Sequence, residues 1–165
     1  MSNTQANQFD IFISYSHEQS RLVLAQKEKL VAADFSVWID NENQPVGDES
    51  MPKWLSSAMI RSLTVLVFFS KAYEASENCQ CELMFAKSKK KPIIYVRAEA
   101  NFRPEEWLCF VMKNAIYVDL TGRKYEEQWK CLIERINKGI DSLNSEMRIT
   151  RKFLSTFFTC YNLFY

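Results

Sequence analysis

The chain has 165 residues, of which 47% are hydrophobic and 25% charged, and its 21 basic and 20 acidic side chains give a formal net charge of +1. This length and composition predict one globular domain that buries its own core. The nearly balanced charge provides no bulk field for nucleic acid or an anionic membrane surface, so we expect neither as a partner. The longest clean apolar run, residues 63–69, is far shorter than the roughly 20 residues of a membrane-spanning helix, so no membrane span is expected.

Cysteine and histidine usage favours a reduced, cytoplasmic protein without a metal site. The five cysteines are odd in number, irregularly spaced and without a C-x-x-C pair, so they predict neither a disulfide framework nor a zinc site. His17 is the single histidine, which excludes a cluster of Cys and His ligands. We therefore expect no metal and no bound cofactor. Residues 1–8 are polar, carry no signal-peptide pattern and are predicted to be a disordered N-terminus.

Hydrophobic patterning predicts strands and helices in alternation. The predicted strands are short apolar runs, and they cover residues 9–15, 35–40, 63–69, 93–96 and 115–119. The predicted helices cover about 16–33, a segment that begins near residue 50, about 76–91, and 125–140. Five strands that alternate with helices predict an α/β fold with a parallel sheet, for which 2-1-3-4-5 is a common strand order.

Two local details accompany these elements. Ser16 and Gln19 are spaced as a capping box, which predicts a helix that begins directly after the first strand. Residues 97–114 are predicted to be irregular or weakly helical, with Trp107, Phe110 and Val111 as packing anchors.

The domain is predicted to span residues 9–143. Residues 144–165 form an aromatic-rich tail that is too short and too interrupted to cross a bilayer. Three roles are open for the tail: docking on the domain, association with another molecule, or the remnant of a longer architecture.

Glu82 is the most unusual charge in the sequence. In a helix, Cys79, Leu83 and Ala86 fall at positions i, i+4 and i+7 and form one apolar stripe, and Glu82 stands beside it. A carboxylate next to a core is costly unless it is hydrogen-bonded or used in chemistry, and burial tends to raise its pKa.

The residues themselves exclude several kinds of site. The three glycines do not form a phosphate-binding loop between a strand and the helix after it, which excludes Rossmann and P-loop nucleotide sites. A phospho-receiver needs an acidic pair after its first strand, where this chain has Ser16 and His17. With a single histidine, no triad can be located from spacing.

Topology points to a site near Glu82. Open parallel sheets bind ligands outside the carboxyl ends of their strands, at the point where the strand order reverses. In the order 2-1-3-4-5 that point lies between the first and third strands. Its walls are then residues 15–18 and the segment that leads from Phe69 to Glu82.

Five successive stretches resemble one known family, the Toll/interleukin-receptor (TIR) domain. The first is Phe9-Asp10-Ile11-Phe12-Ile13-Ser14-Tyr15, which is similar to the first TIR box. The second is Val37-Trp38-Ile39-Asp40 with the following Pro45 and Gly47, which resembles the second strand and the BB loop. The third is Ser76-x-x-Cys79-x-x-Glu82-Leu83, which resembles the S-x-x-C-x-x-E helix motif. The last two, at residues 92–96 and at 106–108 with 117–120, resemble the fourth and fifth strand regions. Over residues 9–143 the chain looks most like stand-alone invertebrate TIR proteins.

The resemblance implies a flavodoxin-like three-layer sandwich and a role in innate-immune signal transduction. Some TIR domains hydrolyse NAD+ at the nicotinamide–ribose bond with a glutamate at the position of Glu82, typically after self-association. NAD+ is then a substrate and no cofactor is implied. The residues expected to bind this substrate are Tyr15, Ser16, His17, Trp38 and Asp40.

Other TIR domains are non-catalytic adaptors that bind further TIR domains through the BB loop. The loop residues expected to make such contacts are Asn43, Pro45, Val46 and Gly47. NAD-cleaving members often carry an aromatic residue four positions before the glutamate, where this chain has Asn78. Both the hydrolase and the adaptor therefore stay open at this point.

Overall fold

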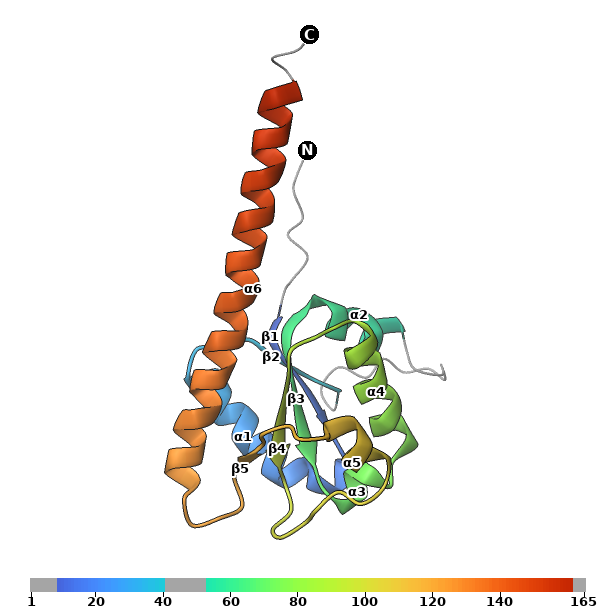
Figure 1. Ribbon diagram of the computed structural model, residues 1–165. Coiled ribbons are helices and arrows are strands. Elements are labelled where there is room, and N and C mark those ends of the chain that lie inside the picture. The colour runs from blue at the N-terminus through green and yellow to red at the C-terminus, as the bar shows by residue number, and fades with distance from the viewer. Residues whose placement is uncertain (1–8, 41–52, 162–165) are drawn as a thin grey trace.

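Five parallel strands form one sheet in the order β2-β1-β3-β4-β5, as predicted (Figure 1). The computed structural model describes residues 9–40 and 53–161, and it describes side chains as far as residue 143. The strands are β1 (Phe9–Tyr15), β2 (Val37–Ile39), β3 (Ser62–Phe69), β4 (Ile93–Arg97) and β5 (Val118–Asp119). The helices are η1 (His17–Gln19, 3-10), α1 (Ser20–Ala32), α2 (Lys53–Arg61), α3 (Lys71–Glu74), α4 (Glu77–Ser88), α5 (Trp107–Met112) and α6 (Tyr125–Tyr161).

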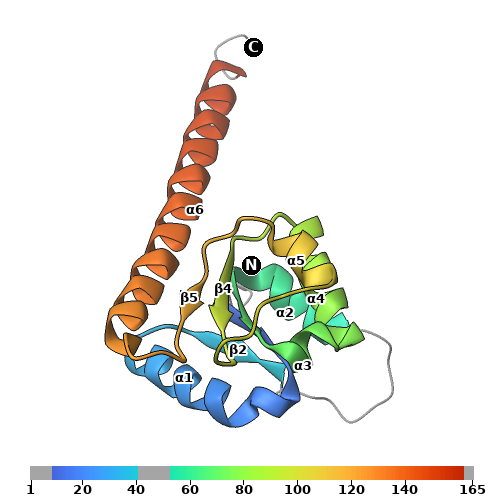
Figure 2. The ribbon, with the colours of Figure 1, turned by 60° about the horizontal axis from the view of Figure 1, so that its bottom comes forward.

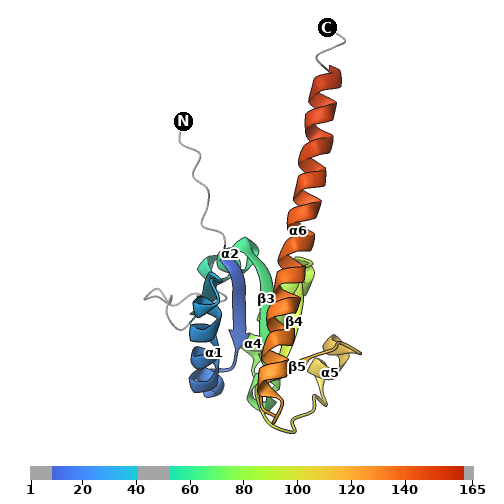
Figure 3. The same cartoon turned by 90° about the vertical axis from the view of Figure 1, so that its left-hand side faces the viewer.

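Helices cover both faces of the sheet, so the fold has three layers. One face packs against α2, α3, α4 and α5, and the other packs against α1 and α6 (Figures 1 and 3). Alternate residues of β1 therefore enter different cores: Phe12 faces α2 and α4, whereas Ile11 and Ile13 face α1 and α6. Because both faces are buried, β1 and β3 are mostly apolar.

The register brings the carboxyl ends of the strands to one edge of the sheet. Ser14 is opposite Val67, and Tyr15 is opposite Phe68. On the far side of β3, Phe69 is opposite Arg97. The segments that follow β1 and β3 therefore leave the sheet side by side, and this arrangement confirms the predicted switch point.

Helix α4 has the predicted apolar stripe. Cys79, Leu83 and Ala86 are buried, and Ser76 begins the helix by accepting a hydrogen bond from the Cys79 N–H at 3.3 Å. This N-cap satisfies one of the backbone donors that a helix start leaves free.

Three local predictions are wrong. Ser16 makes no side-chain cap, because the chain first turns through η1; instead the Gln19 N–H donates to the Ser16 carbonyl oxygen at 2.8 Å. Phe110 is 79% exposed, since the spacing of α5 turns Leu108 and Met112 into the core. Helix α3 lies between the predicted strand at 63–69 and the predicted helix at 76–91, where no helix was predicted, because four residues are too few to show a helical period.

Helix α6 continues past the predicted end of the domain. Its backbone is helical from Tyr125 to Tyr161 without a break at residue 144. In Figures 2 and 3 the C-terminal part of α6 stands clear of the other elements. Within the part of the chain that the structure describes, no helix is long and apolar enough to cross a membrane.

The seating of α4 on the sheet can be tested with two neighbouring residues. Leu83 is fully buried in the core, whereas Met84 is half exposed on the same helix. We expect Leu83→Ala to lower the free energy of unfolding by about 2–5 kcal/mol through lost burial and the cavity it leaves. Met84→Ala should change it by less than about 0.5–1 kcal/mol. Urea unfolding of both variants measures the difference, and equal losses would contradict this packing.

Candidate functional site

Glu82 reaches from α4 to the carboxyl end of strand β1. The Ser14 hydroxyl donates a hydrogen bond of 2.7 Å to Oε2 of Glu82, across 68 positions of sequence. Ser14 is buried on the face of β1 that α4 covers, and Glu82 is partly buried. Glu82 therefore lies at the edge of the sheet where the sequence placed it, and it is held there by Ser14, which the sequence pattern did not single out.

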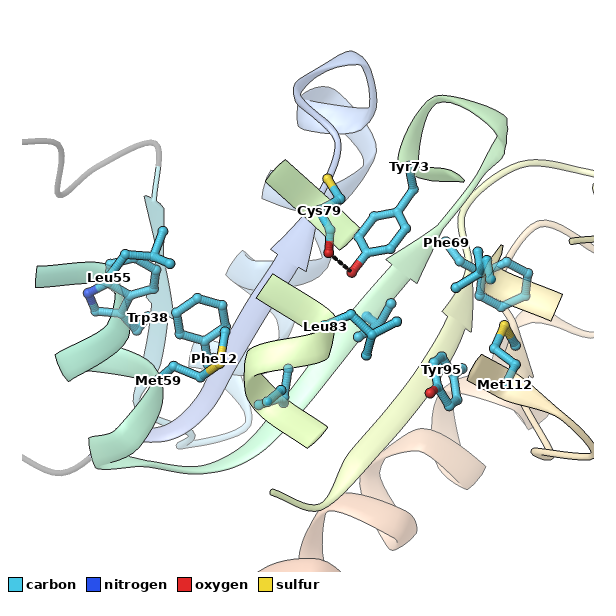
Figure 4. Close-up of a cluster of buried hydrophobic side chains, with 14 of the residues drawn as sticks. Phe12, Trp38, Leu55, Met59, Phe69, Tyr73, Cys79, Leu83, Tyr95 and Met112 are labelled. Carbon is cyan, nitrogen blue, oxygen red and sulfur yellow. Dashed lines mark hydrogen bonds between the residues drawn. The ribbon is translucent and has the colours of Figure 1, made fainter. Parts of the chain in front are cut away.

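Tyr73 of α3 completes a small hydrogen-bonded cluster. Its hydroxyl lies 2.9 Å from the Ser14 hydroxyl and 3.3 Å from the carbonyl oxygen of Cys79 in α4. Figure 4 shows the ring of Tyr73 with its hydroxyl directed at the first turn of α4. The side chain is 0% exposed, so β1, α3 and α4 meet at a polar point inside an apolar core.

The environment of Glu82 favours its neutral form. Burial raises the pKa of the Glu82 carboxyl to about 7; the hydrogen bond from Ser14 opposes this rise, and the negative charge of Asp40 adds to it. A carboxyl that titrates near neutral pH beside a sheet switch point has the property expected of a catalytic group.

The cysteine next to this site is not a nucleophile. Burial raises the pKa of the Cys79 thiol to about 12, so the reactive thiolate is scarce at neutral pH. The Cys79 thiol instead donates to the carbonyl oxygen of Tyr15 at 3.5 Å, which ties α4 to the end of β1.

Tyr15, His17 and Asp40 lie together at the ends of β1 and β2. His17 Nε2 is 3.4 Å from Oδ2 of Asp40, with the two side chains 62% and 15% exposed, respectively. The rings of Tyr15 and His17 meet edge to face, with centroids 5.7 Å apart. Burial, together with the Asp40 carboxylate, raises the pKa of the Tyr15 hydroxyl to about 12, so it remains protonated. Tyr15 is 4% exposed and packs in the core on the α1 side, so His17 and Asp40 are the two of these residues that lie with Glu82 at the edge of the sheet.

The other predicted site residues have different positions. Trp38 is 4% exposed and belongs to the core, where it stacks on Phe12 at 4.6 Å and packs against Trp54, so little of its ring is accessible to a ligand (Figure 4). Ser16 is buried, with its carbonyl oxygen bonded to Gln19. The predicted interaction residues Asn43, Pro45, Val46 and Gly47 lie outside the described residues.

Sequence reasoning missed Ser14 and Tyr73. Ser14 carried one available signal, because it is the one hydroxyl on the α4-facing side of β1. Tyr73 lies in the short helix α3 and gave no periodic signal.

A separate cavity of about 420 Å³ lies beyond the end of β4. It is lined by Arg97, Asn101, Arg103, Pro104 and Tyr117. Arg97 is held by Asp119 at 3.0 Å and stacks over the ring of Tyr117 at 4.5 Å. The cavity includes neither Glu82 nor any predicted site residue.

Residues 11–133 match the family described as TIR domain. The chain belongs to the TIR domain family. The resemblance of the five sequence stretches is thereby confirmed, although stand-alone invertebrate members are not distinguished from other members.

Two solved structures are similar to this TIR domain. One is the TIR domain of the Toll-related receptor TRR-2 from the lower metazoan Hydra magnipapillata, with a TM-score of 0.68 and 18% identity over 79% of this chain and 99% of that one. The other is the activated Roq1 resistosome that recognises the pathogen effector XopQ (TIR domains), with a TM-score of 0.48 and 19% identity over 81% of this chain and 84% of that one. The first supports the fold, and the second adds nothing to it. No match was found among the curated proteins.

Because its pKa is raised, the ionised Glu82 carboxylate lowers the stability of the folded state, and a neutral substitution should remove this cost. The folded state binds the proton more tightly than an unfolded chain, so this group's contribution to stability falls as pH rises from about 4.5 to about 7. We expect Glu82→Gln to be more stable than the wild type by about 2–3 kcal/mol at pH 8, with the difference fading below pH 5. Denaturant unfolding at both pH values measures it.

Glu74 is a buried glutamate whose substitution should change the stability in the opposite direction. Its carboxylate accepts hydrogen bonds from the N–H groups of Glu105 and Glu106, the shortest at 2.9 Å. Glu74→Gln weakens charge-assisted bonds and is expected to lower the stability at pH 8 by about 1–2 kcal/mol. A Glu82→Gln variant that loses stability at pH 8 as Glu74→Gln does would contradict the unfavourable environment of Glu82.

Proposed function

We propose that this TIR domain is a signalling protein that hydrolyses NAD+ at the nicotinamide–ribose bond, with Glu82 as the catalytic carboxylate, and that self-association activates it. The observation that carries the proposal is the position of Glu82: a partly buried carboxylate at the carboxyl edge of a parallel sheet, bonded through one oxygen to Ser14. Its pKa of about 7 leaves both protonation states accessible near neutral pH.

A single carboxylate suits this reaction. The bond between the ribose C1′ and the nicotinamide nitrogen breaks, and its electron pair goes to nicotinamide, which leaves as a neutral molecule. No general acid is needed, unlike the cleavage of an ordinary glycoside with its two carboxyl groups. Water then bonds to C1′ and loses a proton, so the products are nicotinamide, ADP-ribose and H+.

Glu82 acts in its ionised form in this scheme. A negative charge close to C1′ stabilises the oxocarbenium-like transition state, and the same carboxylate can hold the ribose hydroxyls or accept the proton of the attacking water. The proposal therefore requires that activity falls when Glu82 is protonated.

The neighbours of Glu82 supply binding groups for the substrate. His17 offers an aromatic edge, and Asp40 offers an acceptor for a sugar hydroxyl or a partner for His17. Tyr15 is 4% exposed, so it would support the end of β1 from the core. Ser16 would contribute through its backbone, and Trp38 would support β2 from the core.

One observation favours the non-catalytic adaptor as a second function. Asn78, in the first turn of α4, is exposed at the place where NAD-cleaving members often carry an aromatic residue. An adaptor would act through residues 41–49 on a neighbouring TIR domain, and it would show association without NAD+ turnover.

The hydrolase is tested by nicotinamide release from NAD+ at low and high protein concentration. We expect Glu82→Gln to reduce the rate at least about 100-fold, because it keeps the shape but removes the charge. Glu77→Gln is the matched control, since Glu77 is exposed on the same helix and should retain wild-type activity.

Two results would count against the hydrolase. Turnover by Glu82→Gln at more than half the wild-type rate would remove Glu82 from the mechanism. Absence of turnover by the wild type at every concentration, with concentration-dependent association, would assign the adaptor function instead.

A further inference from the structure

A chain of two hydroxyls stands behind the Glu82 carboxylate. It runs from Oε2 of Glu82 to the Ser14 hydroxyl at 2.7 Å, to the Tyr73 hydroxyl at 2.9 Å, and ends at the Cys79 carbonyl oxygen at 3.3 Å. Every link is within hydrogen-bonding distance, and both hydroxyls are buried.

The hydroxyl hydrogens can satisfy this chain of hydrogen bonds in two ways. A hydroxyl has one hydrogen to donate, and a carbonyl oxygen can only accept. With Glu82 ionised, Ser14 donates to Oε2 and Tyr73 donates to Ser14. With Glu82 protonated, the direction reverses: the carboxyl donates to Ser14, Ser14 donates to Tyr73, and Tyr73 donates to Cys79. The carboxyl thus gains or loses a proton while both hydroxyls stay hydrogen-bonded.

The chain is anchored by secondary structure at each point. Ser14 lies in β1, which is paired with a strand on each side. Tyr73 is held by the cap of α3, where the Ser70 hydroxyl accepts from the Tyr73 N–H at 3.1 Å. The Cys79 carbonyl belongs to the capped first turn of α4. Rigid supports of this kind hold a functional group in one orientation.

One carboxylate oxygen is left for a ligand. Among residues 9–40 and 53–143, Ser14 is the donor to Glu82, and it bonds Oε2. Oε1 has no hydrogen bond from these residues, so it is the oxygen that a substrate can approach.

We propose that Ser14 and Tyr73 are positioning residues for Glu82, which hold Oε2 on the protein side, direct Oε1 at the substrate and favour the ionised carboxylate by donation. This inference rests on the proposed function for its kinetic consequences. The geometry itself is independent of the reaction.

The other groups that face Glu82 do not take over this role. Asp40, beyond β2, is negative and disfavours ionisation of Glu82. Tyr15, Tyr73 and Cys79, from β1, α3 and α4, have pKa values raised by burial and remain neutral at pH 7. Ser14 is therefore the group whose loss should make Glu82 harder to ionise.

The test uses Ser14→Ala and Tyr73→Phe, each with a matched control, and Ser14→Thr as the variant that keeps the hydroxyl. Ser62→Ala removes another buried strand hydroxyl, which donates to the Ala58 carbonyl oxygen at 2.8 Å. Tyr95→Phe removes a tyrosine hydroxyl from the same core as Tyr73. The first readout is the titration of the Glu82 side-chain carboxyl, followed by 13C NMR and assigned by its absence in Glu82→Gln. The second is kcat/KM for NAD+ cleavage against pH.

We expect Ser14→Ala to move the midpoint of the Glu82 titration upward by about one pH unit, because it removes a hydrogen bond to a charged group. Tyr73→Phe should move it upward by less, and Ser14→Thr should restore it. The midpoint should not move in Ser62→Ala or Tyr95→Phe. At pH 7 the Ser14→Ala enzyme should be about fivefold slower and should recover at pH 9, whereas purely structural damage lowers activity at every pH.

The outcomes separate this inference from the proposed function. An unchanged or lowered Glu82 midpoint in Ser14→Ala overturns the positioning role, whatever the activity. If the wild type does not cleave NAD+, the proposed function fails, and the carboxyl titration still decides the role of Ser14 and Tyr73.

Discussion

The hydrogen bond between Ser14 and Glu82 joins strand β1 to the helix that covers this face of the sheet, and the candidate site depends on it. Parallel pairing aligns the carboxyl ends of β1 and β3, so the segments that follow them emerge together. Helix α4 is seated by Leu83 and the rest of its apolar stripe, which leaves Glu82 directed at the end of β1. Tyr73 then connects both elements through α3.

Two glutamates in this TIR domain, one buried and one partly buried, illustrate opposite uses of the same side chain. Glu74 accepts hydrogen bonds from backbone N–H groups of the segment that leads into α5, so its carboxylate holds a loop in place. Glu82 has one hydroxyl donor and a negative neighbour in Asp40, and its pKa rises to about 7. A carboxylate that accepts several hydrogen bonds stabilises a fold, whereas a carboxylate with few hydrogen-bond donors can take part in a reaction.

Much of the fold and part of the site could be predicted from the sequence. The parallel sheet followed from apolar runs that alternate with helices, and its strand order is the common one for such a sheet. Glu82 stood out because a charge beside an apolar helical stripe needs a reason. Ser14 and Tyr73 could not be predicted in their roles, since their contact joins residues 59 positions apart and depends on side-chain packing. Trp38 was assigned to a substrate pocket by its place in a motif, yet its stacking on Phe12 places it in the core. The end of the domain at residue 143 was inferred from a change in composition and stays a prediction; the change in composition did not show that the helix at 125–140 runs on to Tyr161.

The central claim is that the Glu82 carboxylate, in its ionised form, performs the cleavage of NAD+. The most direct measurement compares two midpoints on one wild-type sample: the acid limb of kcat/KM against pH, and the 13C titration of the Glu82 carboxyl. The first reports an essential group of the free enzyme, and the second reports Glu82 itself. We predict that the two midpoints coincide near pH 7, with activity rising as Glu82 ionises. Activity that stays constant through the titration of Glu82 would contradict the account.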